Sequence, residues 1–503
     1  MPTLNHSNVS RQRLCFDKYS SSLYITHLFL AILACVVLPI TSCLAAGLVI
    51  PDNGSIATAR GGASVSGIHD PTAGFLNPAL LSRLPGLRLS YNHNLINSQV
   101  SFDRAPTVIP DSYDYELNPE DQGVGQGYAE NEKPLFPFNG LLAMSYQFDT
   151  GLTVGFSVHG PNGSGASKYP VQGSQRYMMT EIDGLLGFVG VSAAQGGSNW
   201  GAGLTLQWAT MTNMSYKMVV DGEISDQINP NVSSIDVEAE IAVKDEAAFT
   251  AIFGAWFRPT PNFELALAGR VLPVHFDAKG DVFVQNTPND TRFSADQLIV
   301  ENGSAGFEFT LPQTARLGLR YLGLDDQGSE YFDLELALVY EAWSSMDELN
   351  VDLEGYVGAL GADLEDVTIA KKWRDTLSVR LGGSYKAQEA LTLLSGIFFE
   401  QGATPKQYAN IDFPSYDRFG ASIGLAFQVM KEVQLVLGYL HIFQHEVKVN
   451  EYEAKVFQQR PIAPCPERCG MNEAGQSYSG VPANAGTHTV SFQSFTLGIN
   501  TTF

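Results

Sequence analysis

The chain has 503 residues, with 30 Lys or Arg against 53 Asp or Glu, so its formal net charge is −23. Such an excess of negative charge disfavours binding to nucleic acid. The mean hydropathy of −0.03 is too low for a bundle of membrane helices, although aromatic residues make up 11% of the chain. A membrane β-barrel gives this average, because half of each strand faces lipid and half faces a polar interior.

Residues 1–45 are predicted to be a signal peptide. An apolar run at 25–40 follows basic residues and precedes small residues, so we expect cleavage after Ala45. The run is shorter than the ~20 residues that a transmembrane helix needs, which makes a helical anchor the weaker alternative. A second alternative is a lipoprotein signal in which Cys43 is lipidated, but an integral barrel needs no such anchor.

Residues 46–85 do not alternate and are rich in small and turn-forming residues. The segment is too long for a loose tail ahead of the first strand. We therefore expect it to fold inside the barrel as a plug.

From residue 86 onward, long segments alternate between apolar and polar residues, as in Phe495, Leu497 and Ile499 near the end of the chain. Soluble sandwich strands alternate too, but they are typically 5–6 residues long, whereas strands that cross an outer membrane need ~9–11 residues. Strands are expected at about 86–104, 140–148, 151–159, 182–194, 199–212, 247–258, 262–275, 313–323, 330–343, 375–386, 390–400, 417–429, 432–448 and 494–503.

Short turns and long polar connections alternate between these strands. The long connections lie near 160–181, 213–246, 276–310, 344–373, 401–416 and 449–487. This asymmetry is typical of periplasmic turns and extracellular loops. We predict an all-β fold, a transmembrane antiparallel β-barrel of about fourteen strands over residues 86–503 in the bacterial outer membrane. It is expected to be a monomer surrounded by lipid and lipopolysaccharide.

The loops carry two further patterns. Acidic residues gather at 111–123 and 221–246, as in solvated exterior loops; the alternative is that some bind Ca²⁺ or Mg²⁺ beside lipopolysaccharide. No stretch has the spacing of a calcium loop, so no metal site is predicted. Cys465 and Cys469 form a close pair, which predicts a disulfide in an oxidising compartment. A metal site is the alternative, although two thiolates without nearby His make a poor zinc site.

Several motifs of this chain resemble the FadL/TodX family of outer-membrane transporters for long-chain fatty acids and hydrocarbons. They are Ala46-Gly47 at the mature start, the Ala-Arg-Gly-Gly-Ala stretch at 59–63, Asp70, and the triplet Asn77-Pro78-Ala79. The family has a fourteen-stranded barrel, an N-terminal hatch with an NPA motif and a C-terminal aromatic residue. The resemblance covers residues 46–503.

The chain departs from the family pattern in two places. The family usually carries two acids before the hatch turn, where this chain has His69-Asp70-Pro71, and the pair Cys465 and Cys469 is not part of the pattern. Both departures concern the identity of the substrate more than the class of protein.

The resemblance implies that residues 46–85 are the hatch, that the mature N-terminus lines a binding pocket, and that substrate leaves sideways through a kink in the wall. Asn77, Pro78 and Ala79 would be the hinge of the hatch; alternatively, they form a turn that caps the helix-like stretch after them. The candidate pocket residues are Ala46, Gly47, Leu48, Val49 and Ile50.

Basic residues on inward faces are candidate partners for a fatty-acid carboxylate. Such arginines more commonly pair with acids of the barrel interior, here Glu264, Asp333 or Glu335, and so tie the plug or the wall together. The candidates are Arg270, Arg316, Arg320 and Arg380.

The resemblance implies passive transport of long-chain fatty acids or other hydrophobic small molecules, with no cofactor. The alternative is a non-transporting barrel whose surface loops serve adhesion or structure, but an adhesin has no use for a plug. The sequence lacks a G-x-S-x-G elbow, a P-loop and an H-E-x-x-H motif, so we do not expect an enzyme. A lipase built around His159 or His441 and a nearby serine is a remote alternative.

Overall fold

The structure is a computed structural model that describes residues 53–105, 127–161, 166–221, 236–288, 290–444, 446–459, 470–471 and 477–503. The chain divides into two units, Met1–Cys43 and Leu44–Phe503, and every described residue belongs to the second. Within the described residues, no helix has the length and apolar character needed to cross a membrane.

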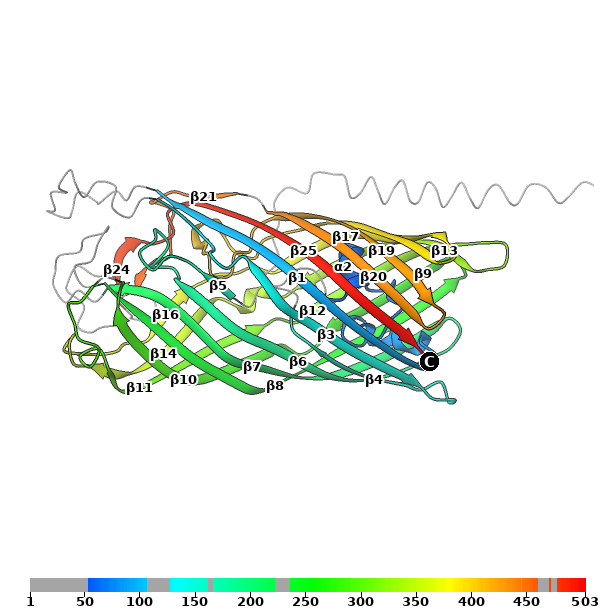
Figure 1. The fold of residues 1–503 in the computed structure, drawn as a ribbon, viewed down its shortest axis with the longest axis horizontal. Helices are drawn as coiled ribbons and strands as arrows, with labels where there is room; N and C mark the ends of the chain where they lie inside the picture. The colour runs from blue at the N-terminus through cyan, green and yellow to red at the C-terminus, as the bar shows by residue number, and fades with distance from the viewer. Residues whose placement is uncertain are drawn as a thin grey trace, which may run out of the picture. The chain divides into compact units, whose positions relative to one another are not determined.

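Fourteen antiparallel strands form a closed barrel, which confirms the predicted fold class (Figure 1). The barrel closes between β1 (Leu87–Arg104) and β25 (Gly486–Thr502), which pair in unbroken register from Arg88↔Thr502 to Arg104↔Gly486. The other wall strands are β3 (Leu135–Gln147), β4 (Thr153–His159), β6 (Glu181–Gly196), β7 (Trp200–Asp221), β8 (Asp236–Thr260), β9 (Phe263–Arg270), β12 (Thr314–Leu324), β13 (Glu330–Glu341), β17 (Thr376–Gln388), β18 (Leu391–Glu400), β19 (Arg418–Met430) and β20 (Val433–Gln444).

The wall continues beyond its predicted height at the end opposite the short turns. There β10 (Val274–Asn286) pairs with β8 and with β11 (Val300–Leu311), while β14 (Glu348–Val357) pairs with β11 and with β16 (Val367–Ala370). The prediction of loops near 276–310 and 344–373 was therefore wrong. The loop predicted at 213–246 is also too long, because β7 reaches Asp221 and β8 begins at Asp236.

Shorter elements complete this end of the molecule. Within the described ranges, four short strands pair with the wall, three form a separate small sheet, and two single 3₁₀ turns lie between strands. They are β2 (Gly127–Glu130), β5 (Ala166–Lys168), β15 (Ala362–Asp363) and β21 (Val447–Val449); β22 (Phe457–Gln459), β23 (Gly470–Met471) and β24 (Ser477–Pro482); and η2 (Trp343–Ser345) and η3 (Lys406–Tyr408).

About halfway along the barrel, the apolar side chains of the wall change from the outer face to the inner face. Strand β7 shows this change. Near the short turns its apolar side chains point outward, with Leu206 62% and Trp208 42% exposed. Beyond Asn213, which has φ 49°, the apolar side chains of Tyr216 and Met218 are buried inside, 6% and 8% exposed. The register with β8 shifts across this stretch, and a slip of one residue exchanges the two faces of a strand.

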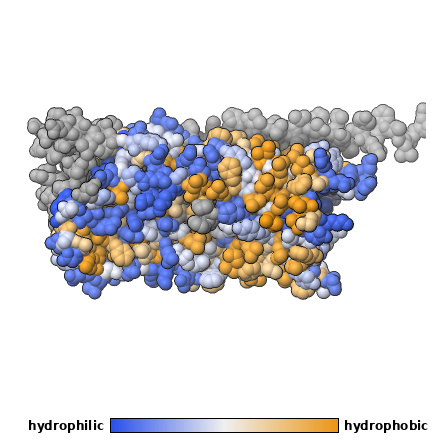
Figure 2. Space-filling model, viewed as in Figure 1, coloured by the Kyte–Doolittle hydropathy of each residue, from blue (hydrophilic) through white to orange (hydrophobic). Residues whose placement is uncertain are grey.

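The same reversal explains the loops that were predicted wrongly. In β10 the charged residues Asp277, Lys279 and Asp281 are exposed, whereas Phe276 and Ala278 are fully buried. A strand with charges outward and apolar residues inward suits a wall that has water outside, not lipid. Figure 2 shows the larger apolar patches gathered toward the end where the chain terminates, and more polar residues, with smaller apolar patches among them, toward the other end. The bilayer therefore surrounds only the half next to the short turns.

Residues 53–85, here called the hatch, pack against the inner face of that lipid-facing half. The hatch contains α2 (Ser55–Ala59), α3 (Ala73–Leu76) and the 3₁₀ helix η1 (Pro78–Arg83). Helix α2 contacts β18, β19, β20 and β25, and η1 contacts β6, β7 and β8. Glycines of the wall make room for it, because a Cβ on Gly203 would lie 2.5 Å from the carbonyl carbon of Pro78.

Candidate functional site

The half of the barrel beyond the bilayer encloses a set of buried apolar side chains, here called the upper cluster. Wall strands supply much of it, and connections fold inward to supply the rest, including Tyr169, Met179 and Ile411. Its aromatic members touch one another: the ring centroids of Phe276 and Phe309 lie 6.5 Å apart. Wall members of the upper cluster include Ile96, Phe102, Met214, Tyr216, Ile241, Val243, Phe276, Phe307, Phe309, Leu349 and Val351.

One buried ion pair lies within the upper cluster. Lys371 Nζ donates to Asp412 Oδ2, and both side chains are at most 1% exposed. The ammonium group also lies 5.6 Å from the centre of the Phe413 ring, and Tyr216 Oη lies 3.3 Å from Asp412 Oδ2. Burial lowers the pKa of Lys371, and the charge of Asp412 partly offsets this effect. The pair provides a polar point among apolar surroundings.

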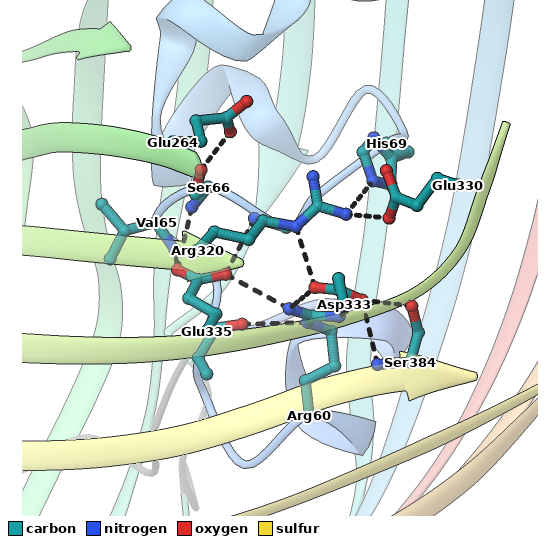
Figure 3. A network of polar contacts seen from close by, with 12 residues as sticks. Arg60, Val65, Ser66, His69, Glu264, Arg320, Glu330, Asp333, Glu335 and Ser384 are labelled. Atoms are coloured by element: carbon teal, nitrogen blue, oxygen red, sulfur yellow. Dashed lines mark hydrogen bonds and ion pairs between the residues drawn. The ribbon is translucent and has the colours of Figure 1, made fainter. Parts of the chain in front are cut away.

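The hatch is attached to the wall by a buried ionic network, which we call the latch (Figure 3). Its centre is Arg60 on the hatch. The guanidinium donates to both carboxylate oxygens of Asp333, at 2.9 and 2.7 Å, and to Glu335 at 3.2 Å. Burial lowers the pKa of Arg60, but the carboxylates of Asp333 and Glu335 together outweigh burial and hold that pKa above its ordinary value. Such a bidentate pair fixes orientation as well as charge.

Glu335 also binds the hatch backbone directly. Its carboxylate accepts N–H bonds from Val65, Ser66 and Gly67 at 2.8, 2.9 and 2.8 Å. These N–H groups belong to a segment without regular secondary structure, so a wall carboxylate supplies the partners that a helix or sheet would otherwise supply. The shape of this loop therefore depends on β13.

Two more wall residues complete the latch. Arg320 on β12 donates to Asp333 at 2.8 Å and to Glu330, and lies 3.1 Å from His69 Nε2. Glu264 on β9 accepts from Ser66 Oγ and from Arg83 at 2.9 Å. The latch thus joins the hatch to β9, β12 and β13.

The other side of the hatch is attached through uncharged groups. Asn53 Nδ2 donates to the Gly160 carbonyl at 3.0 Å, and Asn94 Nδ2 donates to Asn53 Oδ1 at 2.9 Å. Ser55 N donates to Asn92 Oδ1 at 2.8 Å. The attachment therefore has an ionic side at β9, β12 and β13 and an amide side at β1 and the connection that follows β4.

The predicted hinge has a defined local role. Asn77 Nδ2 donates to the Val65 carbonyl at 2.7 Å, and Asn77 Oδ1 accepts from Ala79 N at 3.2 Å. Asn77 is therefore the N-cap of η1, with Pro78 at the first position, where a missing N–H costs nothing. Movement about this triplet stays a prediction. The candidate pocket residues 46–50, and Cys465 and Cys469, lie outside the described residues.

The four candidate arginines have different surroundings. Arg320 belongs to the latch, and Arg380 donates to Glu400 at 3.1 Å and to the Gly62 carbonyl at 3.3 Å. Arg270 lies 5.7 Å from the centre of the Phe188 ring, and Arg316 lies on β12 four residues before Arg320. Arg60 was predicted only as part of a family motif, without an ionic role, and neither Lys371 nor the upper cluster was predicted. Lys371 falls in a stretch that was predicted to be a loop, so no strand pattern directed attention to it.

Among the residues that the structure describes, no group of three or more His, Cys, Asp or Glu is placed to hold a metal ion. His159 stacks on Phe75 of the hatch, with ring centroids 4.0 Å apart, and His441 lies 3.1 Å from Tyr439 Oη. Both imidazoles thus have packing partners.

Comparison with solved structures shows the same fold. A FadL homologue from Pseudomonas aeruginosa aligns with a TM-score of 0.69 over 91% of this chain and 100% of its own, at 18% identity. The toluene transporter TodX from P. putida aligns with a TM-score of 0.60 over 90% of this chain and 99% of its own, at 14% identity.

Curated relatives match over shorter stretches. The long-chain fatty acid transport protein of Escherichia coli K12 is 25% identical over 121 residues, which is 24% of this chain and 25% of that protein. Outer membrane protein P1 of Haemophilus influenzae is 25% identical over 162 residues, 32% of each chain. The matches thus span about a quarter to a third of these relatives. A family of outer membrane transport proteins, described as OMPP1/FadL/TodX, matches residues 36–463. The chain belongs to this family of outer-membrane proteins.

Proposed function

We propose that the protein carries long-chain fatty acids or other hydrophobic small molecules passively across the outer membrane. The observation that supports this most directly is the reversed wall, because the half outside the bilayer is polar outside and apolar inside. A passage for hydrophobic cargo requires an apolar interior, whereas an adhesin or a purely structural barrel does not require one. The names of the matched relatives, a fatty acid transport protein and a toluene transporter, agree with this class of cargo.

The energetics favour capture by the upper cluster. Each methylene group that leaves water gains about 0.8 kcal/mol, so a long acyl chain partitions strongly into an apolar interior. A water-filled pore offers no such gain. Cargo then has to pass the hatch, which occupies the half of the barrel inside the bilayer.

A direct test compares two substitutions on neighbouring residues of β11. Phe309→Asp places a charge within the upper cluster, whereas Thr310→Asp places the same charge on the opposite face of the strand. Uptake of radiolabelled oleate by intact cells should fall strongly in the first variant and stay near wild type in the second. Heat-modifiable mobility of both proteins checks that the barrel has folded. Equal uptake by folded Phe309→Asp and wild-type protein would exclude a role of the upper cluster. Uptake by wild-type cells no higher than that of cells without the protein would overturn the transport proposal and favour the adhesive alternative.

Lys371 is our candidate for contact with a carboxylate head group. A fatty acid that displaced Asp412 would find an ammonium group already buried among apolar side chains. Lys371→Met should therefore raise the apparent KM for a fatty acid but leave uptake of a hydrocarbon unchanged. Lys372→Met is the matched control, since Lys372 pairs with Asp347 and is 36% exposed. Equal losses for both kinds of cargo would indicate a structural role for Lys371.

The N-terminal residues and the hinge remain part of the proposal. Deleting Leu48 to Ile50 should abolish high-affinity uptake, because the resemblance to the family puts these residues in the binding pocket. Replacing Asn77 and Pro78 together should instead change the rate of passage, since it removes the cap of η1 and the fixed proline φ. The inter-strand hydrogen bonds lie in the wall, so both variants should still insert. Wild-type uptake by both variants would contradict the proposed role of the hatch.

A further inference from the structure

The lipid-facing side of the barrel carries a hollow of about 460 Å³ that spans β13, β17 and β18. Its floor contains Gly383, which pairs with Leu334 on β13 and with Ser395 on β18. Large outward side chains surround this floor, among them Tyr385 (52% exposed) and Ile397 (46% exposed). The volume falls in the range of sites that bind small molecules, ~300–1,000 Å³. We call this hollow the outer groove.

The wall beneath the outer groove consists of little more than backbone. On the inner face of the same two strands, Gly382 pairs with Gly396. A Cβ on either glycine would lie 2.1 Å from the carbonyl oxygen of Arg60, so the hatch backbone packs directly on them. Small residues therefore lie on both faces of the wall here, with the hatch against the inner face and the groove on the outer face.

The outer groove is not an exit for cargo in this structure. The ladder between β17 and β18 is unbroken from Ser378↔Glu400 to Lys386↔Thr392, so the wall is closed behind the groove. Whatever fills the groove has to come from the membrane side. The groove is continuous with the lipid-facing band, where Leu377, Leu393 and Phe399 are 40–46% exposed.

From its position and lining we infer that the outer groove binds one acyl chain of a phospholipid from the periplasmic leaflet. The groove lies close to the short turn between Gln388 and Leu391, which places it in the half of the bilayer on that side. Tyr331 and Tyr385 are exposed near the same end, as expected at the level of lipid head groups.

Photocrosslinking tests this inference with the full-length protein in phospholipid nanodiscs. The probe is a phosphatidylglycerol with a diazirine in one acyl chain, and crosslinked peptides are mapped by mass spectrometry. Labelling of residues 381–397 should exceed labelling of the outward face of β19 about fivefold, equivalent to roughly 1 kcal/mol of preferential binding. Uniform labelling around the barrel would show that the groove is filled only by bulk lipid and would overturn the inference.

Substitutions at Ser395 separate filling of the groove from damage to the wall. Ser395→Phe should fill the groove and reduce its labelling to the level of β19. Ser395→Ala removes only the hydrogen bond to the Ser422 carbonyl, 3.0 Å long, and should keep the labelling. Ala193→Phe is the matched control, an outward small residue on β6 outside the groove. Undiminished labelling in folded Ser395→Phe, or equal loss in Ala193→Phe, would contradict a specific site.

Discussion

Arg60 is the central hatch residue of the latch. It is 1% exposed, and it neutralises part of the charge that Asp333 and Glu335 place inside the barrel. A buried charge is tolerated only when it is paired and hydrogen-bonded. The carboxylates of Asp333 and Glu335 thus depend on Arg60 to neutralise part of their charge, and the hatch depends on these carboxylates for its attachment.

Arg60→Met should loosen the hatch without unfolding the wall. Breaking a buried ion pair by removing one partner typically costs ~3–5 kcal/mol, and we expect the lower end because Asp333 keeps Arg320. Hydrogen exchange of the hatch amides should accelerate, while exchange in β19 and β20 stays unchanged. Lys133→Met, which breaks an exposed pair with Glu181, should cost less than ~1 kcal/mol. Unchanged hatch exchange in Arg60→Met would contradict the latch.

We expect Asp70 to make the stability of the hatch depend on pH. Burial raises the pKa of its carboxyl, and hydrogen bonds from Thr72 partly offset the rise. A folded-state pKa above the ordinary value near 3.8 means that the folded form binds the proton more tightly. Its stabilising contribution is therefore full at pH below that ordinary value and is lost as pH rises through the raised pKa.

Asp70→Asn should remove this dependence and stabilise the protein at neutral pH, because the amide oxygen can still accept from Thr72. We expect the difference in thermal unfolding temperature between the variant and the wild type to be largest at pH 8 and to shrink as the pH is lowered. Unfolding monitored by heat-modifiable mobility at several pH values measures it. A difference that does not change with pH would rule out Asp70 as the titrating group.

At the scale of elements, strands in the bilayer were predictable and their continuations were not. The prediction of 313–323 agrees with β12 (Thr314–Leu324), and that of 390–400 with β18 (Leu391–Glu400). Where lipid surrounds a strand, its apolar residues point outward and its polar residues point inward. The sequence-based prediction assumed this arrangement for every strand. In β10 the residues still alternate, but the apolar ones point inward and the polar ones outward. The segment was therefore predicted to be a loop.

The candidate site was less predictable than the wall, for physical reasons. Alternation showed that Arg320 and Asp333 face inward, but not that Arg60, far away in the sequence, would lie between Asp333 and Glu335. Lys371 belongs to an irregular segment between β16 and β17, where no period assigns a face. Pairings of this kind depend on closure of the barrel, which a local pattern does not contain.

The irregularity of β7 is itself testable. Asn213 has φ 49°, a conformation that Asn tolerates and β-branched residues do not. Asn213→Val should therefore destabilise the barrel by ~1–2 kcal/mol, whereas Asn213→Gly should be neutral. Thr212→Val is the control at a neighbouring position. Thermal unfolding of the three variants is the measurement, and equal stability of Asn213→Val and Thr212→Val would show that the positive φ is not required.

At the scale of the whole molecule, the prediction concerns orientation. The short turns lie at the end of the barrel next to the lipid-facing half of the wall, and the reversed half lies at the other end (Figure 1). Epitope tags inserted near residues 225 and 475 should therefore be accessible to antibody on intact cells, and tags near 197 and 388 should become accessible only after the outer membrane is broken. Surface labelling at 197 or 388 would reverse the orientation.

The reversed half of the wall also affects how the protein can insert into the membrane. To reach the cell exterior, the segment that carries Asp277, Lys279 and Asp281 has to cross the hydrocarbon layer first. A Lys exposed to lipid at mid-depth costs ~2–4 kcal/mol and an Asp costs less, so spontaneous insertion of an unpaired strand that carries all three charges faces a kinetic barrier. Folding into the membrane therefore requires a protected path, in which charged outward positions stay shielded until they emerge.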